Sequence, residues 1–246
     1  MEKVKLNLDA DVQSEYRSTN VMAGIERLRV MVKFASFTLP VEMTITTRTN
    51  RTRGVHMSRL VEAAFKNSEV KHIEEGMARI IDDVQKTQGP AYVSVNFDYP
   101  FKDVFVKVRI SLKGKRFLYM LSVPGITACP CSREVAGIGH MQRAWLSIAI
   151  PSRKYVDIEE VIVKMQECFS STTSELMKRP EEGLKVLDSQ ANPKFVEDVV
   201  RDAVKRFPNA MMIKAKSEES IHMHDAVAYV YRKNSASFFD EMLWFS

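Results

Sequence analysis

The sequence predicts an α+β protein in which antiparallel strands and helices follow one another in the order strand, strand, helix, helix, strand, strand. Residues 30–47 are rich in strand-forming residues, and residues 91–123 alternate with the period of half-buried strands. The stretch between them has helical spacing, and the chain after residue 126 repeats this order in part. We expect two units, residues 1–125 and 126–246, packed as one compact domain because no linker separates them.

The first unit begins with two strands within Val30–Thr47, which we expect to meet in a tight turn at Pro40. Apolar residues at helical spacing within Ser58–Gln88 predict a short helix followed by a longer one. Gly89-Pro90 ends this helical segment. Further antiparallel strands are predicted at residues 91–99, 104–110 and 117–123.

The second unit begins with a short strand, Trp145–Ile150. A helix is expected to start at Asp157, with a capping-box spacing to Glu160 and an apolar stripe that continues to Met177. Another helix is expected to open at Asn192-Pro193, with proline at its first position. Pro208 would end that helix, and residues 211–215 and 226–231 are the predicted closing strands.

Composition predicts a soluble, cytoplasmic chain without a membrane partner. No apolar run approaches the roughly 18 residues that span a bilayer, and Met1–Ala10 lacks the apolar core of a signal peptide. The net charge of +5 is compatible with solubility alone or with an anionic partner. Basic and aromatic residues do not interleave, so we expect a small phosphorylated ligand and no nucleic acid.

The cysteines do not predict a disulfide framework. There are three, an odd number, and a bond between Cys129 and Cys131 would be strained because they are only two residues apart. Cys168 lies beside the apolar stripe of its predicted helix, so we expect it in the core.

Two candidate sites lie in loops. Gly54–Arg59 separates a strand from a helix, where backbone N–H groups and Arg59 could bind a phosphate; alternatively, Ser58 is only a helix cap and His56 a loop residue. Cys129-Pro130-Cys131-Ser132 is followed by His140 and Arg143, and a thiolate with an imidazole can bind one zinc-like ion. The second thiol would then be free as a nucleophile or acid; the alternative is a pair of buried structural thiols.

Histidines and carboxylates supply the other candidates. His222 and His224 would share one face of a strand and could bind a metal or transfer protons, or simply be exposed. The acidic pairs Glu181-Glu182 and Glu197-Asp198 are candidates whose alternative is a solvated surface position.

Together these segments resemble the GTP cyclohydrolase type IB family over most of the chain. Each segment is unspecific alone, and the resemblance rests on their order and spacing. The segments that carry it are Asp11-Val12-Gln13-Ser14, His56-Met57-Ser58-Arg59, Cys129-Pro130-Cys131-Ser132, Gln142-Arg143, Asn192-Pro193-Lys194-Phe195-Val196-Glu197-Asp198 and Glu219-Ser220-Ile221-His222.

The resemblance implies a tandem tunnelling fold, in which a barrel forms by oligomerisation, usually as a homotetramer with active sites between subunits. It also implies hydrolysis of GTP to 7,8-dihydroneopterin triphosphate and formate, the first step towards tetrahydrofolate. The cofactor implied is a divalent transition metal, and Zn, Mn and Fe(II) all accept the ligand types present.

Residue roles carried over from the family fall into three groups. The implied metal ligands are Cys129 and His222, with His140 and Glu182 completing or adjoining the site. The implied catalytic residues are Cys129, Cys131, His140 and His224, and the implied substrate-binding residues are His56, Arg59, Arg143 and Glu197. Glu197 would accept the two adjacent donors of guanine. The chain departs from the family at Met141 and Met223, where asparagine is usual, and in a slightly shorter spacing between Cys131 and His140.

Three other functions share some of these features. An archaeal relative releases a cyclic phosphate from GTP with Fe(II), and a nitrile reductase of the same fold uses a cysteine and NADPH. A basic RNA-binding protein without catalysis would hold no metal and would bind RNA with a steep salt dependence. Metal content therefore separates the enzyme from the RNA-binding protein.

Overall fold

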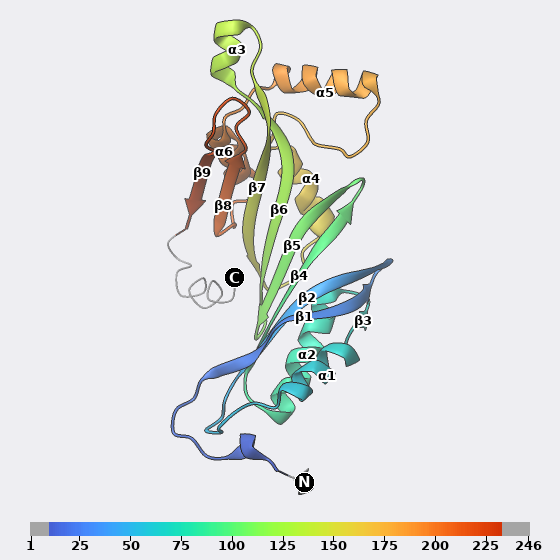
Figure 1. The fold of residues 1–246 in the computed structure, drawn as a ribbon, viewed down its shortest axis with the longest axis vertical. Coiled ribbons are helices and arrows are strands. Elements are labelled where there is room, and N and C mark those ends of the chain that lie inside the picture. The colour runs from blue at the N-terminus through green and yellow to red at the C-terminus, as the bar shows by residue number, and fades with distance from the viewer. Residues whose placement is uncertain (1–9, 233–246) are drawn as a thin grey trace, which may run out of the picture. The chain divides into compact units, whose positions relative to one another are not determined.

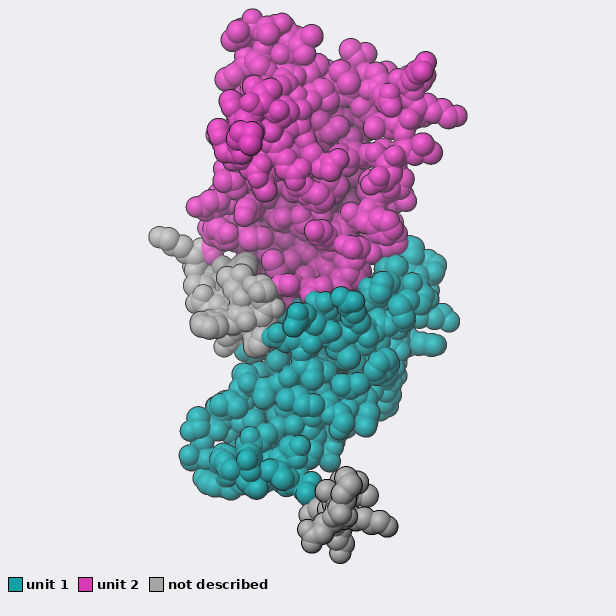
Figure 2. All heavy atoms as spheres, viewed as in Figure 1, with its two compact units in different colours: residues 1–95, 112–115 teal, residues 96–111, 116–246 magenta. Residues whose placement is uncertain are grey.

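The computed structural model describes residues 10–232, so the expectation for Met1–Ala10 lies almost wholly outside the described residues. The chain forms two compact units, residues 1–95 with 112–115 and residues 96–111 with 116–246 (Figure 2). The boundary expected between residues 125 and 126 falls inside strand β6 (Arg116–Ala128), so the compact units do not coincide with the expected repeat units.

The first unit pairs long antiparallel strands with two helices (Figure 1). Strand β1 (Met22–Phe34) pairs with β2 (Phe37–Arg48), and the short β3 (Glu69–Val70) pairs parallel with β1. The strand order is β3-β1-β2-β4, where β4 spans Ala91–Phe101. Two helices, α1 (Met57–Lys66) and α2 (Ile73–Thr87), match the short and long helices that the spacing predicted.

The turn between β1 and β2 was predicted at the wrong place. The strands are joined at Ala35-Ser36, where Ala35 adopts a left-handed conformation with φ 50°. Pro40 lies inside β2, opposite Met31. The turn was missed because no glycine or asparagine marks it, and proline normally ends a strand.

In the second unit the strand order is β4-β5-β6-β7-β8-β9. Its other strands are β5 (Val104–Lys113), β7 (Met141–Ser152), β8 (Met212–Ser217) and β9 (Ala226–Tyr231), all close to the predicted ranges or extending them. Its helices are α3 (Pro130–Ala136), α4 (Ile158–Gln166), α5 (Arg179–Ala191) and α6 (Val196–Arg206). Apolar side chains of β6, β7, α4 and α6 form its core, among them Leu121, Ile148, Ile162 and Val199.

Three helix predictions need correction. Helix α4 ends at Gln166 instead of continuing to Met177, and the backbone of Ser170 and Ser171 pairs with Ile126 of β6 instead of continuing the helix. Helix α5 was not predicted. Helix α6 begins at Val196, not at Pro193, since a carboxylate oxygen of Asp198 accepts a bond from Phe195 N at 3.1 Å and fixes the start there.

The α+β class is confirmed. Elements β1, β2, α1, α2, β4 and β5 follow one another in the predicted order, with the short β3 between α1 and α2. Elements β6, β7, α4, α6, β8 and β9 form a second such series with α3 and α5 inserted, so the second series begins at β6, a strand that the prediction placed in the first unit. Within residues 10–232, no helix is long and apolar enough to cross a membrane.

Candidate active site

A pocket of about 260 Å³ in the second unit brings together half of the predicted site residues. It lies where the end of β6, the start of β7, the start of α6 and the β8–β9 loop meet. The predicted residues that line it are Cys129, His140, Glu197, His222 and His224, and its other polar lining residues are Thr127, Gln142, Lys194, Ser217 and Glu219.

The main chain places Cys129 and His140 side by side. Cys129 N donates a hydrogen bond to His140 O at 2.9 Å, so the ends of the α3 loop close on each other. Cys129 is also the N-terminal cap of α3, and its Sγ accepts a bond from Ser132 N at 3.5 Å. A Cβ at Gly139 would lie 2.5 Å from Cys129 O, so this approach requires glycine.

A buried polar chain orients the His140 ring. Its Nδ1 lies 2.8 Å from Gln142 Oε1, and Gln142 Nε2 donates to Thr127 Oγ1 at 3.2 Å. The Thr127 hydroxyl lies 3.2 Å from Ser217 Oγ, and both residues are 1% exposed. With the Gln142 oxygen facing the ring, a neutral imidazole that donates this bond has its proton on Nδ1 and its lone pair on Nε2.

His222 and His224 lie in the loop between β8 and β9, not on the expected strand. Their rings nevertheless stack, with centroids 5.1 Å apart and 12° between planes. The His222 ring meets that of His140 edge to face at 6.4 Å. The three imidazoles therefore cluster on one wall of the pocket.

Glu219 belongs to this site although no role was assigned to it from the sequence. Its carboxylate lies 3.9 Å from His140 Nδ1, and its side chain is only 10% exposed. The available signal was its place in the run Glu219-Ser220-Ile221-His222, next to a candidate ligand. A buried carboxylate beside imidazoles can accept a proton or bind a metal.

Glu197 lines the pocket from the first turn of α6. Val196, Val199 and Val200 form the buried face of this helix, and Glu197 lies off that face with an exposed side chain.

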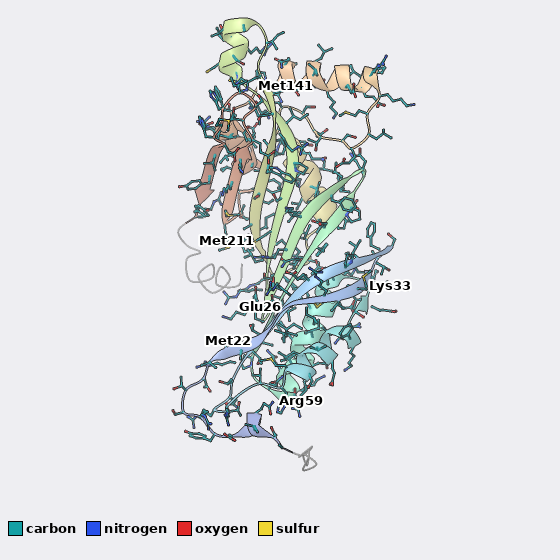
Figure 3. The ribbon with its side chains drawn as sticks, viewed as in Figure 1. Met22, Glu26, Lys33, Arg59, Met141 and Met211 are labelled. Atoms are coloured by element: carbon teal, nitrogen blue, oxygen red, sulfur yellow. The ribbon has the colours of Figure 1, made fainter. Side chains whose placement is uncertain are left out.

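Five predicted residues do not line this pocket, and three of them belong to the second unit. Cys131 is exposed on α3, although it is only two residues from Cys129. Glu182 is exposed on α5, and Arg143 is exposed on β7 two residues after Met141, which Figure 3 labels at the start of that strand.

His56 and Arg59 line a separate pocket of about 290 Å³ in the first unit. Arg59 lies on α1 (Figure 3), and His56, not Ser58, is the cap residue of that helix. The main-chain N–H of His56 donates to Gln88 Oε1 at 2.8 Å, which holds this loop. The same pocket is lined by Arg48, Thr49 and Asn50. Its two arginines, Arg48 and Arg59, outnumber its one carboxylate, Asp11.

The donor set suits a transition metal, but the ligands do not close around one point. Thiol, imidazole and carboxylate groups are ligands for Zn, Mn and Fe(II), and Cys129, His140, His222 and Glu219 all line one pocket. Among residues 10–232, however, no three such side chains lie close enough to hold an ion in this arrangement.

Cys168 is buried, as its place in the apolar stripe predicted. Burial raises the pKa of this thiol to about 11, so it stays protonated at neutral pH. It is therefore a packing residue and not a nucleophile.

The family model described as type I GTP cyclohydrolase folE2 matches residues 10–228. A Kosmotoga olearia protein named GTP cyclohydrolase FolE2 is 32% identical, over 92% of this chain and 99% of the relative. Proteins of the same name from Caldicellulosiruptor saccharolyticus (32% identical, 74% of this chain and 79% of the relative) and Syntrophobacter fumaroxidans (29%, 90% and 98%) are also similar. This chain belongs to the type I GTP cyclohydrolase family.

Proposed function

We propose that this chain is a metal-dependent GTP cyclohydrolase that converts GTP to 7,8-dihydroneopterin triphosphate and formate, the first step of tetrahydrofolate synthesis. The observation that carries the proposal is the convergence of Cys129, His140, His222 and Glu197 on one pocket in a chain of this family. The proposed fold is the tandem tunnelling fold, and the proposed assembly is a homotetramer with active sites at subunit interfaces.

Glu197 is the proposed anchor for guanine. The base presents N1–H and the 2-amino group side by side, and a carboxylate can accept both. The exposed carboxylate at the first turn of α6 lines the pocket and is free of the buried helix face. It would hold the base so that C8 faces the thiol and imidazole wall.

Cys129, His140 and His222 are the proposed metal ligands. Glu219 is the carboxylate best placed to complete the set, because Glu182 does not line the pocket in one chain. A divalent ion bound there would supply hydroxide near neutral pH by lowering the pKa of water to about 7. His140 keeps its Nε2 lone pair for this purpose through its bond to Gln142.

Proton transfers fall to the residues around this ligand set. Opening the ring after water adds at C8 requires an acid at the departing nitrogen. His224 lines the pocket and stacks on His222, so it is the proposed donor. Cys131 is the proposed second thiol of the reaction, and the pocket of His56, Arg48 and Arg59 is the proposed site for the triphosphate.

Elemental analysis and product analysis test the proposal together. Wild-type protein should hold about one transition metal per active site and convert GTP to the neopterin triphosphate. Cys129→Ala and His222→Ala should lose the metal, whereas Cys168→Ala removes a thiol outside the pocket and should retain it. Full occupancy in the first two variants would contradict the ligand assignment. A cyclic phosphate product would favour the archaeal-type reaction.

Base recognition is tested at Glu197. Glu197→Gln keeps the size of the side chain but sets a donor against the donors of guanine, which should cost about 1–3 kcal/mol, or roughly tenfold to a hundredfold in GTP affinity. Glu134→Gln changes an exposed carboxylate on α3 and is the matched control. An unchanged dissociation constant for Glu197→Gln, measured with metal present, would remove Glu197 from the site.

A further inference from the structure

Lys194 is a largely buried cation at the pocket to which no role has yet been assigned. It lies two residues before α6, lines the pocket, and has a side chain that is only 12% exposed. Lysine side chains are seldom buried to this degree unless their ammonium group is paired. The contacts of this ammonium group therefore indicate what the residue does.

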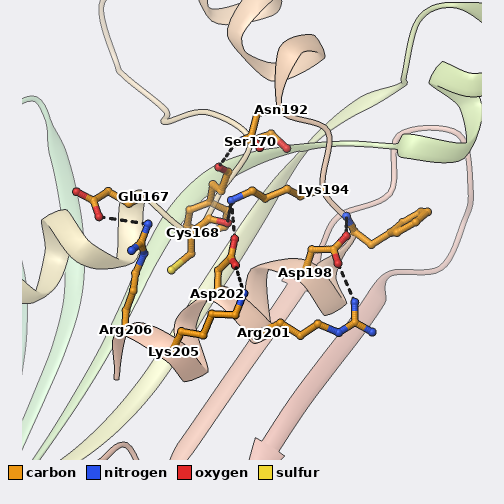
Figure 4. A network of polar contacts seen from close by, with 12 residues as sticks. Glu167, Cys168, Ser170, Asn192, Lys194, Asp198, Arg201, Asp202, Lys205 and Arg206 are labelled. Carbon is orange, nitrogen blue, oxygen red and sulfur yellow. Dashed lines mark hydrogen bonds and ion pairs between the residues drawn. The ribbon is translucent and has the colours of Figure 1, made fainter. Parts of the chain in front are cut away.

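The Lys194 side chain connects two segments that are distant in sequence (Figure 4). Its Nζ donates to Cys168 O at 3.0 Å and to an Asp202 carboxylate oxygen at 2.9 Å. Cys168 belongs to the turn after α4, and Asp202 lies in the middle of α6. One ammonium group thus joins α6 to that turn.

The Lys194 main chain adds a third segment. Its N–H donates to Ala128 O at 3.0 Å, at the last residue of β6. Two residues earlier, Asn192 Nδ2 donates to Phe169 O at 3.2 Å. The segment 192–194 therefore lies against both the end of β6 and the turn after α4.

The turn after α4 is itself attached to β6. Ile126 N donates to Ser171 O at 2.8 Å, and Ser170 N donates to Ile126 O at 2.9 Å. Ala128 N donates to Ser170 Oγ at 3.2 Å. The end of β6 and the turn form one hydrogen-bonded block, and Lys194 binds this block from the side of α6.

Two walls of the pocket are consequently connected through Lys194. Ala128 immediately precedes Cys129 on one wall, and Lys194 is followed after two residues by Glu197 on the other. We propose that Lys194 is a positioning residue that fixes the start of α6 against the end of β6, and so sets where Glu197 lies relative to Cys129. The consequence for GTP rests on the function proposed above.

The Lys194 ammonium group forms an ion pair with Asp202 of the same chain. This pairing favours a role in positioning α6 over direct contact with the substrate. Burial raises the pKa of the Asp202 carboxyl. The hydrogen bonds and charges of Lys194 and Lys205 lower this pKa by a larger amount, so the net shift is downward and the carboxyl is ionised. Two of the three ammonium donors are used on Cys168 and Asp202.

The test compares Lys194→Met with Lys205→Met. Methionine keeps the length of the side chain and removes its donors. Lys205 approaches the other oxygen of Asp202 at 3.5 Å but is 77% exposed and does not line the pocket, so it is the matched control. Readouts are the dissociation constants of GTP and guanosine and the amide exchange rates of residues 126–131 and 195–199, measured on folded, metal-loaded protein.

Lys194→Met should weaken GTP and guanosine by the same factor, about tenfold to a hundredfold, because misplacing a recognition group by about 1 Å has effects of this size. Amide exchange should accelerate in both segments, and Lys205→Met should leave every readout unchanged. Lys194→Arg keeps the charge and should restore part of the affinity. If the methionine variant does not fold, the same affinities and exchange rates are measured on Lys194→Arg.

Several results would overturn the assignment. Unchanged exchange in both segments would show that Lys194 does not connect them. A loss confined to GTP, with guanosine unaffected, would instead make Lys194 a phosphate contact. An equal loss in Lys205→Met would point to the charge of Asp202 alone. If wild-type protein bound neither GTP nor guanosine while exchange still responded to Lys194→Met, the proposed function would fail and the positioning role would stand.

Discussion

Gln142 Oε1 lies 2.8 Å from His140 Nδ1, and the amide nitrogen of the same side chain is committed to Thr127. This relationship determines which ring nitrogen carries the proton. If Gln142 were reversed, its NH2 group would face the ring and its oxygen would face a hydroxyl, and Nε2 would then carry the proton. The buried hydroxyl groups of Thr127 and Ser217 therefore hold the Gln142 amide in this orientation, and the amide in turn orients the His140 ring.

Gln142→Leu should reduce metal affinity by about tenfold to a hundredfold, because groups that orient a ligating histidine have effects of this size. Competition with a chelator measures the affinity, and nitrogen NMR of the metal-free protein reports the ring tautomer. Gln142→Glu keeps an acceptor at Nδ1 and should retain both properties. Equal affinity in Gln142→Leu and wild type would separate the polar chain from metal binding.

Cys131→Ala should keep the fold and the metal but lose turnover. The thiol is exposed and does not line the pocket with Cys129, so its removal leaves the ligand set intact. Metal content and GTP turnover should be measured on the same preparation. A parallel loss of both would make Cys131 a ligand, and normal turnover would make it dispensable.

Gly125→Ala should lower the free energy of unfolding by about 1–3 kcal/mol, the usual cost of overfilling a core. A Cβ at this position would lie 2.2 Å from the ring of Phe169, which is 2% exposed and cannot swing aside. Gly183→Ala is the control: nothing lies within 4 Å of its Cβ in α5, so alanine should stabilise by about 0.5–1 kcal/mol. Urea unfolding decides, and equal stability of Gly125→Ala and wild type would mean that the ring has room to move.

Asp83 should contribute stability that disappears in acid. Hydrogen bonds from Lys66, Lys86 and Asn67 hold the pKa of this carboxyl well below its usual range. Because the folded pKa is depressed, the stabilisation is present above the unfolded value of about 4 and is lost as pH falls below it. Both lysines are largely exposed, so solvent limits the effect to about 1 kcal/mol or less.

The corresponding measurement is the free energy of unfolding of Asp83→Asn and wild type from pH 7 to pH 3. The two curves should differ at pH 7 and converge towards pH 3. Asp82→Asn, at the exposed neighbouring position, should follow wild type throughout. A constant difference for Asp83→Asn would assign its effect to packing instead of charge.

Periodicity was sufficient for elements whose burial repeats along the chain. Helices α1 and α2 and strands β4 to β6 were predicted because one face of each is continuously apolar. Helix α5 could not be found in this way, since it buries only Ser189 and exposes Leu184 and Leu187. The turn between β1 and β2 was wrongly predicted at Pro40, because the true turn at Ala35 depends on a backbone conformation that alanine rarely adopts.

The site was predictable where the chemistry of a residue type is distinctive. Cys129, His140, His222, His224 and Glu197 were named from the sequence and line one pocket. Lys194, Gln142 and Glu219 were present in the same segments but received no role, because their function depends on partners distant in the sequence. Lys194 bonds to Ala128 and Cys168, and Glu219 lies beside His140. Pairing over such distances leaves no local pattern.

The Gln190 amide group pairs with the main chain of Gly139, accepting from its N–H at 2.8 Å and donating to its oxygen at 2.9 Å. The Gln190 side chain thereby makes with Gly139, the residue before His140, the two hydrogen bonds that a neighbouring strand would make. Positions in this loop therefore differ in how far they tolerate substitution. Val135 and Ile138 are exposed and should accept other side chains. Position 139 must remain glycine, and residue 190 must retain an amide side chain. A library randomised across residues 133–139 should tolerate diversity except at Gly137, whose φ of 75° favours glycine, and at position 139.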